Sequence, residues 1–165
     1  PIQMKVGEQL DTVYFFTAGA KDCEAVFTLG PRSTLIDLPI RVQGLEDNGC
    51  AAVYSTKRPW YRFISVAKGT AYFQEPIEAA NTIWAGNLFV ADDKAVKLTV
   101  VIDGQAAGAK PFVEVHNPTD KPINTTLRSP EQTPIFGGST GQVTIPAGDT
   151  VRLLIEGKTL RAMTQ

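Results

Sequence analysis

The stretch Phe112-Val-Glu-Val-His-Asn-Pro-Thr-Asp-Lys-Pro-Ile-Asn-Thr-Thr-Leu127 contains the clearest structural pattern of the chain. Apolar and polar residues alternate with a period of two on both sides of residues 117–122. This alternation is typical of β-strands in a sheet with one solvated face. Because the intervening residues are rich in Asn, Pro and Asp, they predict a turn. The stretch therefore predicts two strands that pair as an antiparallel hairpin.

Similar short segments, bounded by turn residues, recur along the whole chain. Pro39 interrupts one of them and indicates an edge strand or a bulge there. Lys68-Gly69 predicts a tight hairpin turn, and residues 74–81 contain the only segment suited to a short helix. The predicted strands cover residues 11–18, 25–29, 34–42, 50–54, 60–66, 71–73, 82–84, 87–91, 95–102, 112–116, 123–128, 143–145 and 151–155.

Strands at this spacing, without a helix of normal length, predict an all-β fold. We expect an antiparallel β-sandwich of the immunoglobulin-like or jelly-roll kind. The 165 residues suit a single domain over residues 1–165, with residues 105–110 as the one candidate internal boundary. The apolar sides of the strands predict a core that includes Leu98, Val100, Val113, Val115, Val143, Ile145, Val151 and Leu153.

The composition excludes several classes of partner. Apolar residues make up 43% of the chain and charged residues 20%, which is ordinary for a globular protein. Sixteen Lys and Arg against 17 Asp and Glu give a net charge of −1, so no strong field attracts an anionic polymer. No apolar run approaches the roughly 20 residues that span a bilayer. We therefore expect neither a nucleic-acid partner nor a membrane partner.

Catalytic groups are scarce in this sequence. His116 is the single histidine, so a serine triad with Ser129 or Ser139 would have to use it, and no Gly-x-Ser-x-Gly motif supports either serine. Pro1 has a secondary amine that could act as a base or nucleophile in an enzyme. We expect a non-catalytic protein without cofactor or metal, with a small enzyme that uses Pro1 or His116 as the third hypothesis.

Other conspicuous residues have simple structural interpretations. Asp92-Asp93 is interpreted as a pair of solvated turn acids, and residues 137–141 as a flexible glycine-rich loop. Cys23 and Cys50 match no zinc or redox motif. A disulfide in an exported protein and two buried thiols remain equally open.

The candidate binding residues are the two tryptophans and their polar neighbours. Trp60 and Tyr61 are adjacent, so in a strand they face opposite sides, and Arg58 shares the side of Trp60. A rigid exposed ring is a platform for a sugar ring, whose hydroxyls bond to neighbouring polar groups. We predict a carbohydrate site in which a sugar stacks on Trp60 or Trp84, with Arg58, Tyr61 and Asn87 as hydrogen-bonding neighbours. The alternative is that both tryptophans are core residues.

Two segments of the last third carry a resemblance to a known class. Val-His-Asn-Pro-Thr-Asp-Lys-Pro-Ile (115–123) and Val-Thr-Ile-Pro-Ala-Gly-Asp-Thr-Val-Arg-Leu (143–153) resemble hairpins in β-sandwich accessory modules of exported bacterial polysaccharide-active proteins. The resemblance implies a secreted or extracellular module that binds a polysaccharide or oligosaccharide beside a catalytic domain. It carries over no catalytic residue. The alternative function is a purely structural sandwich that packs against a catalytic domain or another subunit.

Overall fold

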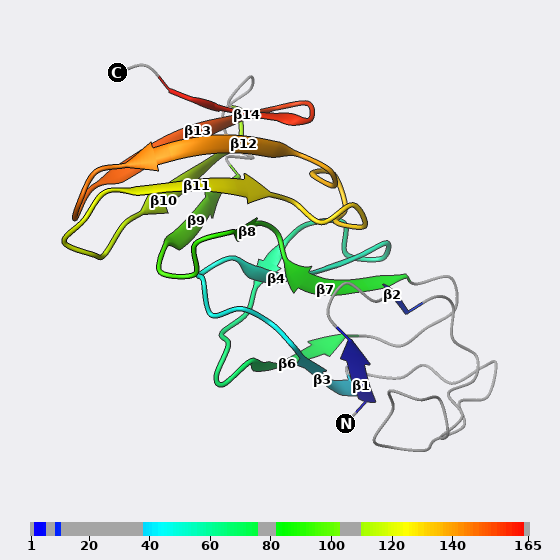
Figure 1. Cartoon of the computed structure of the whole chain (residues 1–165). Coiled ribbons are helices and arrows are strands. Elements are labelled where there is room, and N and C mark those ends of the chain that lie inside the picture. Colours follow the sequence, from blue (N-terminus) through cyan, green and yellow to red (C-terminus); the bar gives the residue numbers. More distant parts are fainter. Residues whose placement is uncertain (1, 6–8, 11–37, 76–81, 103–109, 164–165) are drawn as a thin grey trace. The chain divides into compact units, whose positions relative to one another are not determined.

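The computed structural model describes residues 2–5, 9–10, 38–75, 82–102 and 110–163. Within these residues the protein is all-β and contains no helix (Figure 1). No described helix could therefore be long and apolar enough to cross a membrane. The chain divides into two compact units: residues 1–47 with 51–87, and residues 48–50 with 88–165. The expected boundary at 105–110 falls almost entirely outside the described residues.

The first unit contains two small sheets. One has the strand order β1-β3-β6, and β1 is parallel to β3. The other has the order β2-β7-β4-β5 and is antiparallel throughout. The strands are β1 (Ile2–Lys5), β2 (Gln9–Leu10), β3 (Leu38–Gln43), β4 (Ala51–Ser55), β5 (Arg62–Phe63), β6 (Thr70–Glu75) and β7 (Ile83–Asn87).

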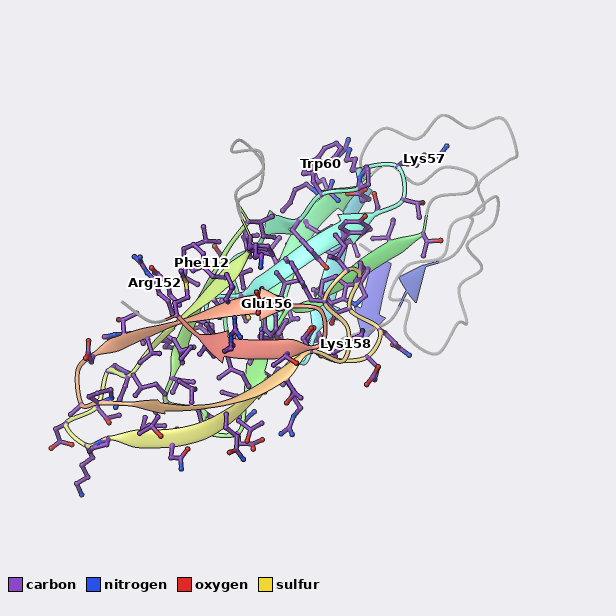
Figure 2. All side chains as sticks on the ribbon, turned by 90° about the horizontal axis from the view of Figure 1, so that it is seen from above. Lys57, Trp60, Phe112, Arg152, Glu156 and Lys158 are labelled. Atoms are coloured by element: carbon purple, nitrogen blue, oxygen red, sulfur yellow. The ribbon has the colours of Figure 1, made fainter. Side chains whose placement is uncertain are left out.

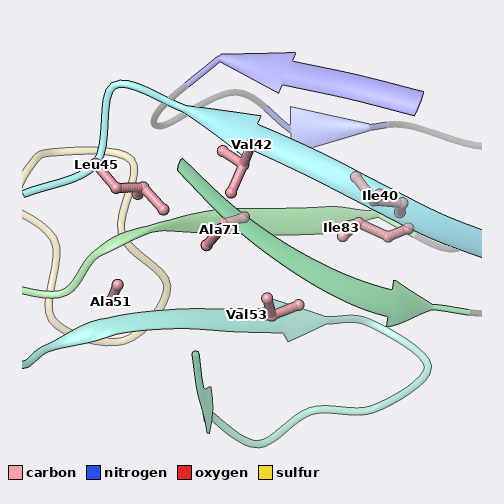
Figure 3. Packing of buried hydrophobic residues seen from close by; sticks show 8 residues of the cluster. Ile40, Val42, Leu45, Ala51, Val53, Ala71 and Ile83 are labelled. Carbon is pink, nitrogen blue, oxygen red and sulfur yellow. The ribbon is translucent and has the colours of Figure 1, made fainter. Parts of the chain in front are cut away.

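One hydrophobic cluster joins the two sheets of the first unit (Figure 3). Alternate residues of β3, β4 and β7 point into it, as the period of two requires. Ile40 and Val42 of β3 are fully buried, and Val53 of β4 is 2% exposed. The other buried members are Leu45, Ala51, Ala71, Ile83 and Ala85.

The second unit contains one curled seven-stranded sheet (Figure 1). Its order is β8-β11-β12-β14-β13-β10-β9. β12 and β14 are parallel, so the sheet is mixed. The strands are β8 (Val90–Ala91), β9 (Lys97–Val101), β10 (Phe112–His116), β11 (Ile123–Arg128), β12 (Thr140–Ile145), β13 (Thr150–Glu156) and β14 (Thr159–Ala162).

The predicted core of this sheet is confirmed at seven of eight positions. Leu98, Val100, Val113, Val115, Val143, Ile145 and Leu153 are all buried. Val151 is only partly buried, so that prediction was wrong. The ladder between β13 and β14 covers only the segment from Leu153 to Glu156, and Val151 lies beyond its end.

The hairpin predicted between residues 112–116 and residues 123–128 does not form. β10 pairs with β9 and β13, whereas β11 pairs with β8 and β12. The connecting residues 117–122 instead contact the turn between β12 and β13. The Asn117 amide N–H donates to Asp149 O at 2.9 Å, and its side-chain Nδ2 donates to Ile145 O at 3.2 Å and Pro146 O at 3.1 Å. The turn residues therefore serve a longer connection between strands that are not neighbours.

The last two predicted strands, residues 143–145 and 151–155, are not neighbours in the sheet, because an additional strand lies between them. Residues 158–163 were not predicted to form structure, but β14 lies between β12 and β13 in the sheet. Gly141 makes this insertion possible, because a Cβ atom there would lie 2.5 Å from the Leu160 carbonyl oxygen. A side chain at residue 141 would separate β12 from β14.

Three further expectations have mixed outcomes. β3 is a central strand, not an edge strand, and Pro39 is tolerated because the β1 ladder begins at Ile40. Lys68 and Gly69 form the expected turn with φ values of 50° and 76°. Ala67 and Thr70 on either side of this turn form an antiparallel bridge with two backbone hydrogen bonds of 2.8 and 3.0 Å, so the tight hairpin turn is confirmed. The longer strands near it pair elsewhere, β6 with β3 and β5 with β4. The strands expected at 11–18 and 25–29, and most of the helix expected within 74–81, lie outside the described residues.

Candidate functional site

The loop between β4 and β5 holds Trp60 in a fixed, exposed position. Ser55 anchors the loop: its amide N–H donates to Arg58 O at 3.3 Å, and its Oγ accepts from the Arg58 amide at 3.0 Å. The Trp60 amide donates to Arg58 O at 2.8 Å, which closes a tight turn around Pro59. Trp60 is 54% exposed (labelled in Figure 2). The backbone thus presents the ring to solvent.

A buried carboxylate lies on the same side of the chain as Trp60. Glu75 of β6 is fully buried, and its Oε1 accepts from Ser55 Oγ at 2.6 Å. Nη1 of Arg62 is 2.7 Å from Glu75 Oε2, and Nη1 of Arg58 is 3.9 Å from the same oxygen. The closer contact is an ion pair without the alignment of a hydrogen bond. Two guanidinium groups therefore face one buried carboxylate.

Arg62 also contacts Trp60. Its Cζ lies 5.9 Å from the centroid of the Trp60 ring, within the range of a cation–π interaction. Arg58, Trp60 and Arg62 occupy alternate positions, and the predicted common side of Arg58 and Trp60 agrees with their shared contacts to the Arg62–Glu75 pair. Trp60, Arg58, Arg62, Glu75 and Ser55 are called the Trp60 cluster below.

Tyr61 belongs to a different group of rings. Its ring centroid lies 5.1 Å from that of Tyr54 and 6.1 Å from that of Trp84, which it meets edge-on. Burial, and secondarily the neighbouring Tyr54, raise the pKa of Tyr61 well above its usual range, so the phenol stays protonated. Trp60 and Tyr61 thus contact different partners, as their adjacent positions predict. The five predicted site residues do not form one site.

Trp84 is a core residue and not an exposed platform. It is 2% exposed and lies directly opposite Tyr54 in the ladder between β4 and β7. A Cβ atom at Gly86 would approach the Trp84 ring to 2.9 Å, so the glycine makes room for the indole on the same strand face. The Trp84-Ala-Gly86 spacing is therefore a packing signal. The alternative interpretation of this tryptophan is the correct one.

Asn87 has a structural role in the first unit. It is 2% exposed, its Oδ1 accepts from the Glu46 amide at 2.9 Å and its Nδ2 donates to Glu46 O at 2.8 Å. Both polar ends of the amide thus hold the backbone of the segment that follows β3. In the ladder between β4 and β7, Ser55 pairs with Ile83. Asn87 is four residues from Ile83, which corresponds to about 13 Å along the strand. It is not a neighbour of the Trp60 cluster.

Sequence reasoning missed Arg62, Glu75 and Ser55. Arg62 continues the alternate spacing of Arg58 and Trp60, so the same periodicity could have included it. Glu75 follows Ala71 and Phe73 on the inward side of β6, and an acidic residue at an inward position is a signal of a buried polar group. Ser55 carries no comparable signal.

The other catalytic hypotheses receive no added support from the described residues. His116 Nδ1 is 3.0 Å from Thr150 Oγ1, its cross-strand neighbour. Ser139 Oγ donates to Gly157 O at 3.1 Å, so it is engaged elsewhere. Pro1 lies outside the described residues. Cys50 is buried and its Sγ contacts Asn48 Oδ1 and Phe89 O, and Cys23 lies outside the described residues.

The acidic turn and the glycine-rich loop have local partners. Asp92 forms an ion pair with Arg128, and Asp93 Oδ1 accepts from the Ala95 amide at 2.9 Å. The loop before β12 is tied by backbone bonds, including Gly137 N–H to Thr133 O at 2.9 Å. A Cβ atom at residue 137 would lie 2.2 Å from a backbone oxygen, so this glycine serves close packing.

The second unit contains a shallow polar groove of about 860 Å³. Glu114, Asp149, Thr150 and Arg152 line it, together with Thr144, Pro146, Val151 and Met163. Arg152 Nε donates to Glu114 Oε1 at 2.9 Å, and Arg152 Cζ lies 5.4 Å from the Phe112 ring centroid (Figure 2). Arg152 and Glu114 thus neutralise each other, Asp149 adds one further carboxylate to the groove, and Phe112 is already covered by Arg152.

Comparisons of the chain with protein-family models, with curated proteins and with solved structures find no match. The candidate function therefore depends on the chemistry of the Trp60 cluster.

Proposed function

We propose that this chain is a non-catalytic β-sandwich module of an exported protein and that it binds carbohydrate through Trp60. The observation that carries the proposal is the exposed indole on a loop fixed by the Ser55–Arg58 hydrogen bonds. A flat apolar ring surrounded by fixed polar groups suits a sugar, which has apolar C–H faces and a polar rim.

The fixed loop favours binding because its backbone is ordered before the ligand arrives, so that only the Trp60 side chain has to adjust. Ordering a mobile loop on binding would consume part of the interaction free energy. Arg62 contacts the ring, and Arg58 and Arg62 both approach Glu75 and are the cationic groups of the Trp60 cluster. Trp84 and Asn87 have no part in the proposed site.

The test is a titration of wild-type protein and two tryptophan variants with neutral and acidic oligosaccharides. Trp60→Ala should weaken binding by roughly 1–3 kcal/mol, by analogy with aromatic stacking on nucleobases. The folded state should survive, because the ring is more than half exposed. Trp84→Ala is the contrasting variant, and removal of its buried ring should destabilise the protein by about 3–5 kcal/mol.

Tryptophan fluorescence, calorimetric titration and a thermal melt of each variant separate these effects. A broad glycan panel that produces no response in the wild-type protein would refute carbohydrate binding. An unchanged affinity in folded Trp60→Ala would move the site away from this ring.

One observation favours the structural-module alternative. Ile135 is 72% exposed and has a φ of 69°, which is unfavourable for a β-branched residue. Its loop is held by the bond from Phe136 N–H to Pro134 O at 2.8 Å and by Lys158 Nζ, which donates to Gly137 O. A strained, exposed apolar side chain on a tied loop suits contact with another protein. A negative result in the glycan panel would favour this second candidate.

A further inference from the structure

One edge of the Arg62 guanidinium is bound and the other is not. Nη1 is 2.7 Å from Glu75 Oε2, which fixes the orientation of the group. Nε and Nη2 are inaccessible to water and have no hydrogen-bond partner among the described residues. Buried donors without an acceptor have an unmet hydrogen-bonding capacity, and each such group calls for an explanation.

The unbonded atoms have a defined chemical preference. Nε and Nη2 form the side edge of the guanidinium, where two N–H groups point in nearly the same direction. This edge matches the two oxygens of a carboxylate and can bind them with two parallel hydrogen bonds. A neutral sugar hydroxyl offers a single oxygen and satisfies the edge less well.

The local charge also favours an anion. Arg62 Nη1 lies 2.7 Å and Arg58 Nη1 3.9 Å from the same Glu75 oxygen, so guanidinium groups surround the buried carboxylate. The side chains of Arg58 and Arg62 are 33% and 25% exposed, whereas Glu75 is fully buried. The positive charge is therefore the part of the cluster that a ligand would meet.

The Trp60 ring is a solvent-exposed neighbour of Arg62. It lies over the guanidinium at 5.9 Å, but it is 54% exposed and is not part of the buried core. A shift of this ring would expose the side edge of Arg62 without opening the core. Glu75 would keep the guanidinium in place while the ring moves onto a ligand.

We propose that Arg62 binds a carboxylate and that the ligand of the Trp60 cluster is an acidic sugar of the uronic acid class. The proposal rests on the proposed function and specifies its ligand class. Trp60 stacks on the sugar ring, Nε and Nη2 of Arg62 bind the carboxylate, and Glu75 holds Arg62 in orientation.

The test uses an oligomer of galacturonic acid and the methyl ester of the same oligomer, titrated calorimetrically into the full chain. The ester keeps the sugar ring and removes the charge. We expect the acid to bind at least about tenfold more tightly, since hydrogen bonds to ionised groups are roughly twice as strong as neutral ones. The preference should shrink at high salt, because screening weakens exposed charge interactions.

Two variants assign the preference to Arg62. Arg62→Lys keeps the positive charge but has no two-donor edge, so it should lose most of the preference for the acid. Arg152→Gln is the matched control, because Arg152 also combines a ring contact with a carboxylate partner but lies in the second unit. It should retain the full preference.

Each outcome has a separate meaning. Equal affinity for acid and ester would overturn the carboxylate assignment and leave sugar binding at Trp60 intact. Absence of binding by both forms would overturn the acidic-sugar proposal, and sugar binding itself would fall only if the neutral glycans also gave no response. A preference that survives in folded Arg62→Lys would overturn the role of Arg62. The comparison of acid and ester in wild-type protein decides the ligand class even if the lysine variant does not fold.

Discussion

Two arginines of this protein each combine an aromatic ring with a carboxylate, and the two groups differ mainly in burial. In the second unit, Arg152 lies over Phe112 and pairs with Glu114 on the outer face of a regular sheet. In the first unit, Arg62 lies over Trp60 and pairs with the fully buried Glu75. The side chains of Arg152 and Glu114 are 59% and 29% exposed, against 25% and 0% for Arg62 and Glu75.

This difference separates a surface interaction from a candidate site. Water competes for both members of the Arg152–Glu114 pair, so the pair contributes about 0–1 kcal/mol. Glu75 has no access to water, and its charge is compensated only by neighbouring protein groups. The buried Glu75 carboxylate therefore fixes Arg62 in place, whereas the Arg152–Glu114 pair is an exposed ion pair on the surface of a sheet. The first region is organised around a buried charge, whereas the second is an exposed ion pair that lines a polar groove.

The prediction with the largest expected effect tests directly whether burial distinguishes the two arginine–carboxylate pairs. Glu75→Ala leaves Arg58 and Arg62 without their carboxylate and should destabilise the protein by about 3 kcal/mol, the lower end for a broken buried pair because both arginines still reach water. Glu114→Ala should change stability by less than about 1 kcal/mol. Urea unfolding of both variants measures the difference. Equal effects would show that burial does not distinguish the two groups.

A second test concerns the regular sheet of the second unit. Leu98 and Val115 are 2% and 0% exposed and lie opposite each other in the ladder between β9 and β10. Truncation of either to Ala should cost roughly 1–4 kcal/mol, through lost burial and the cavity left behind. Chemical denaturation checks both variants. A loss below about 0.5 kcal/mol at both positions, the usual range for surface sites, would mean that the stability of this unit arises elsewhere.

The smallest effect should be a gain in stability. Ile135→Gly removes an unfavourable left-handed conformation at a side chain that contributes little burial. Relief of the steric cost, offset by the higher backbone entropy of glycine, should stabilise the protein by up to about 1 kcal/mol. Ile135→Val is the control and should melt like the wild type. A less stable glycine variant would show that Ile135 makes stabilising contacts in the isolated chain.

The candidate site was only partly predictable from sequence. Trp60 and Tyr61 contact different partners, as predicted, although a tight turn around Pro59 and not a regular strand positions Trp60. Trp84 and Asn87 could not be assigned in the same way, since their burial depends on the packing of β7 within its sheet. Glu75 comes from another sheet, and no local pattern links it to Arg62.

The sequence by itself determined that the protein is all-β and where most of the described strands lie. Alternation and turn chemistry are local properties, and β10 and β13 follow them closely. The tertiary structure alone decided which strands pair, the insertion of β14 between β12 and β13, and the contact between Arg62 and Glu75. The physical reason is that a period of two specifies which face of a strand is buried, whereas the partner is selected by packing and hydrogen bonding between residues far apart in the chain.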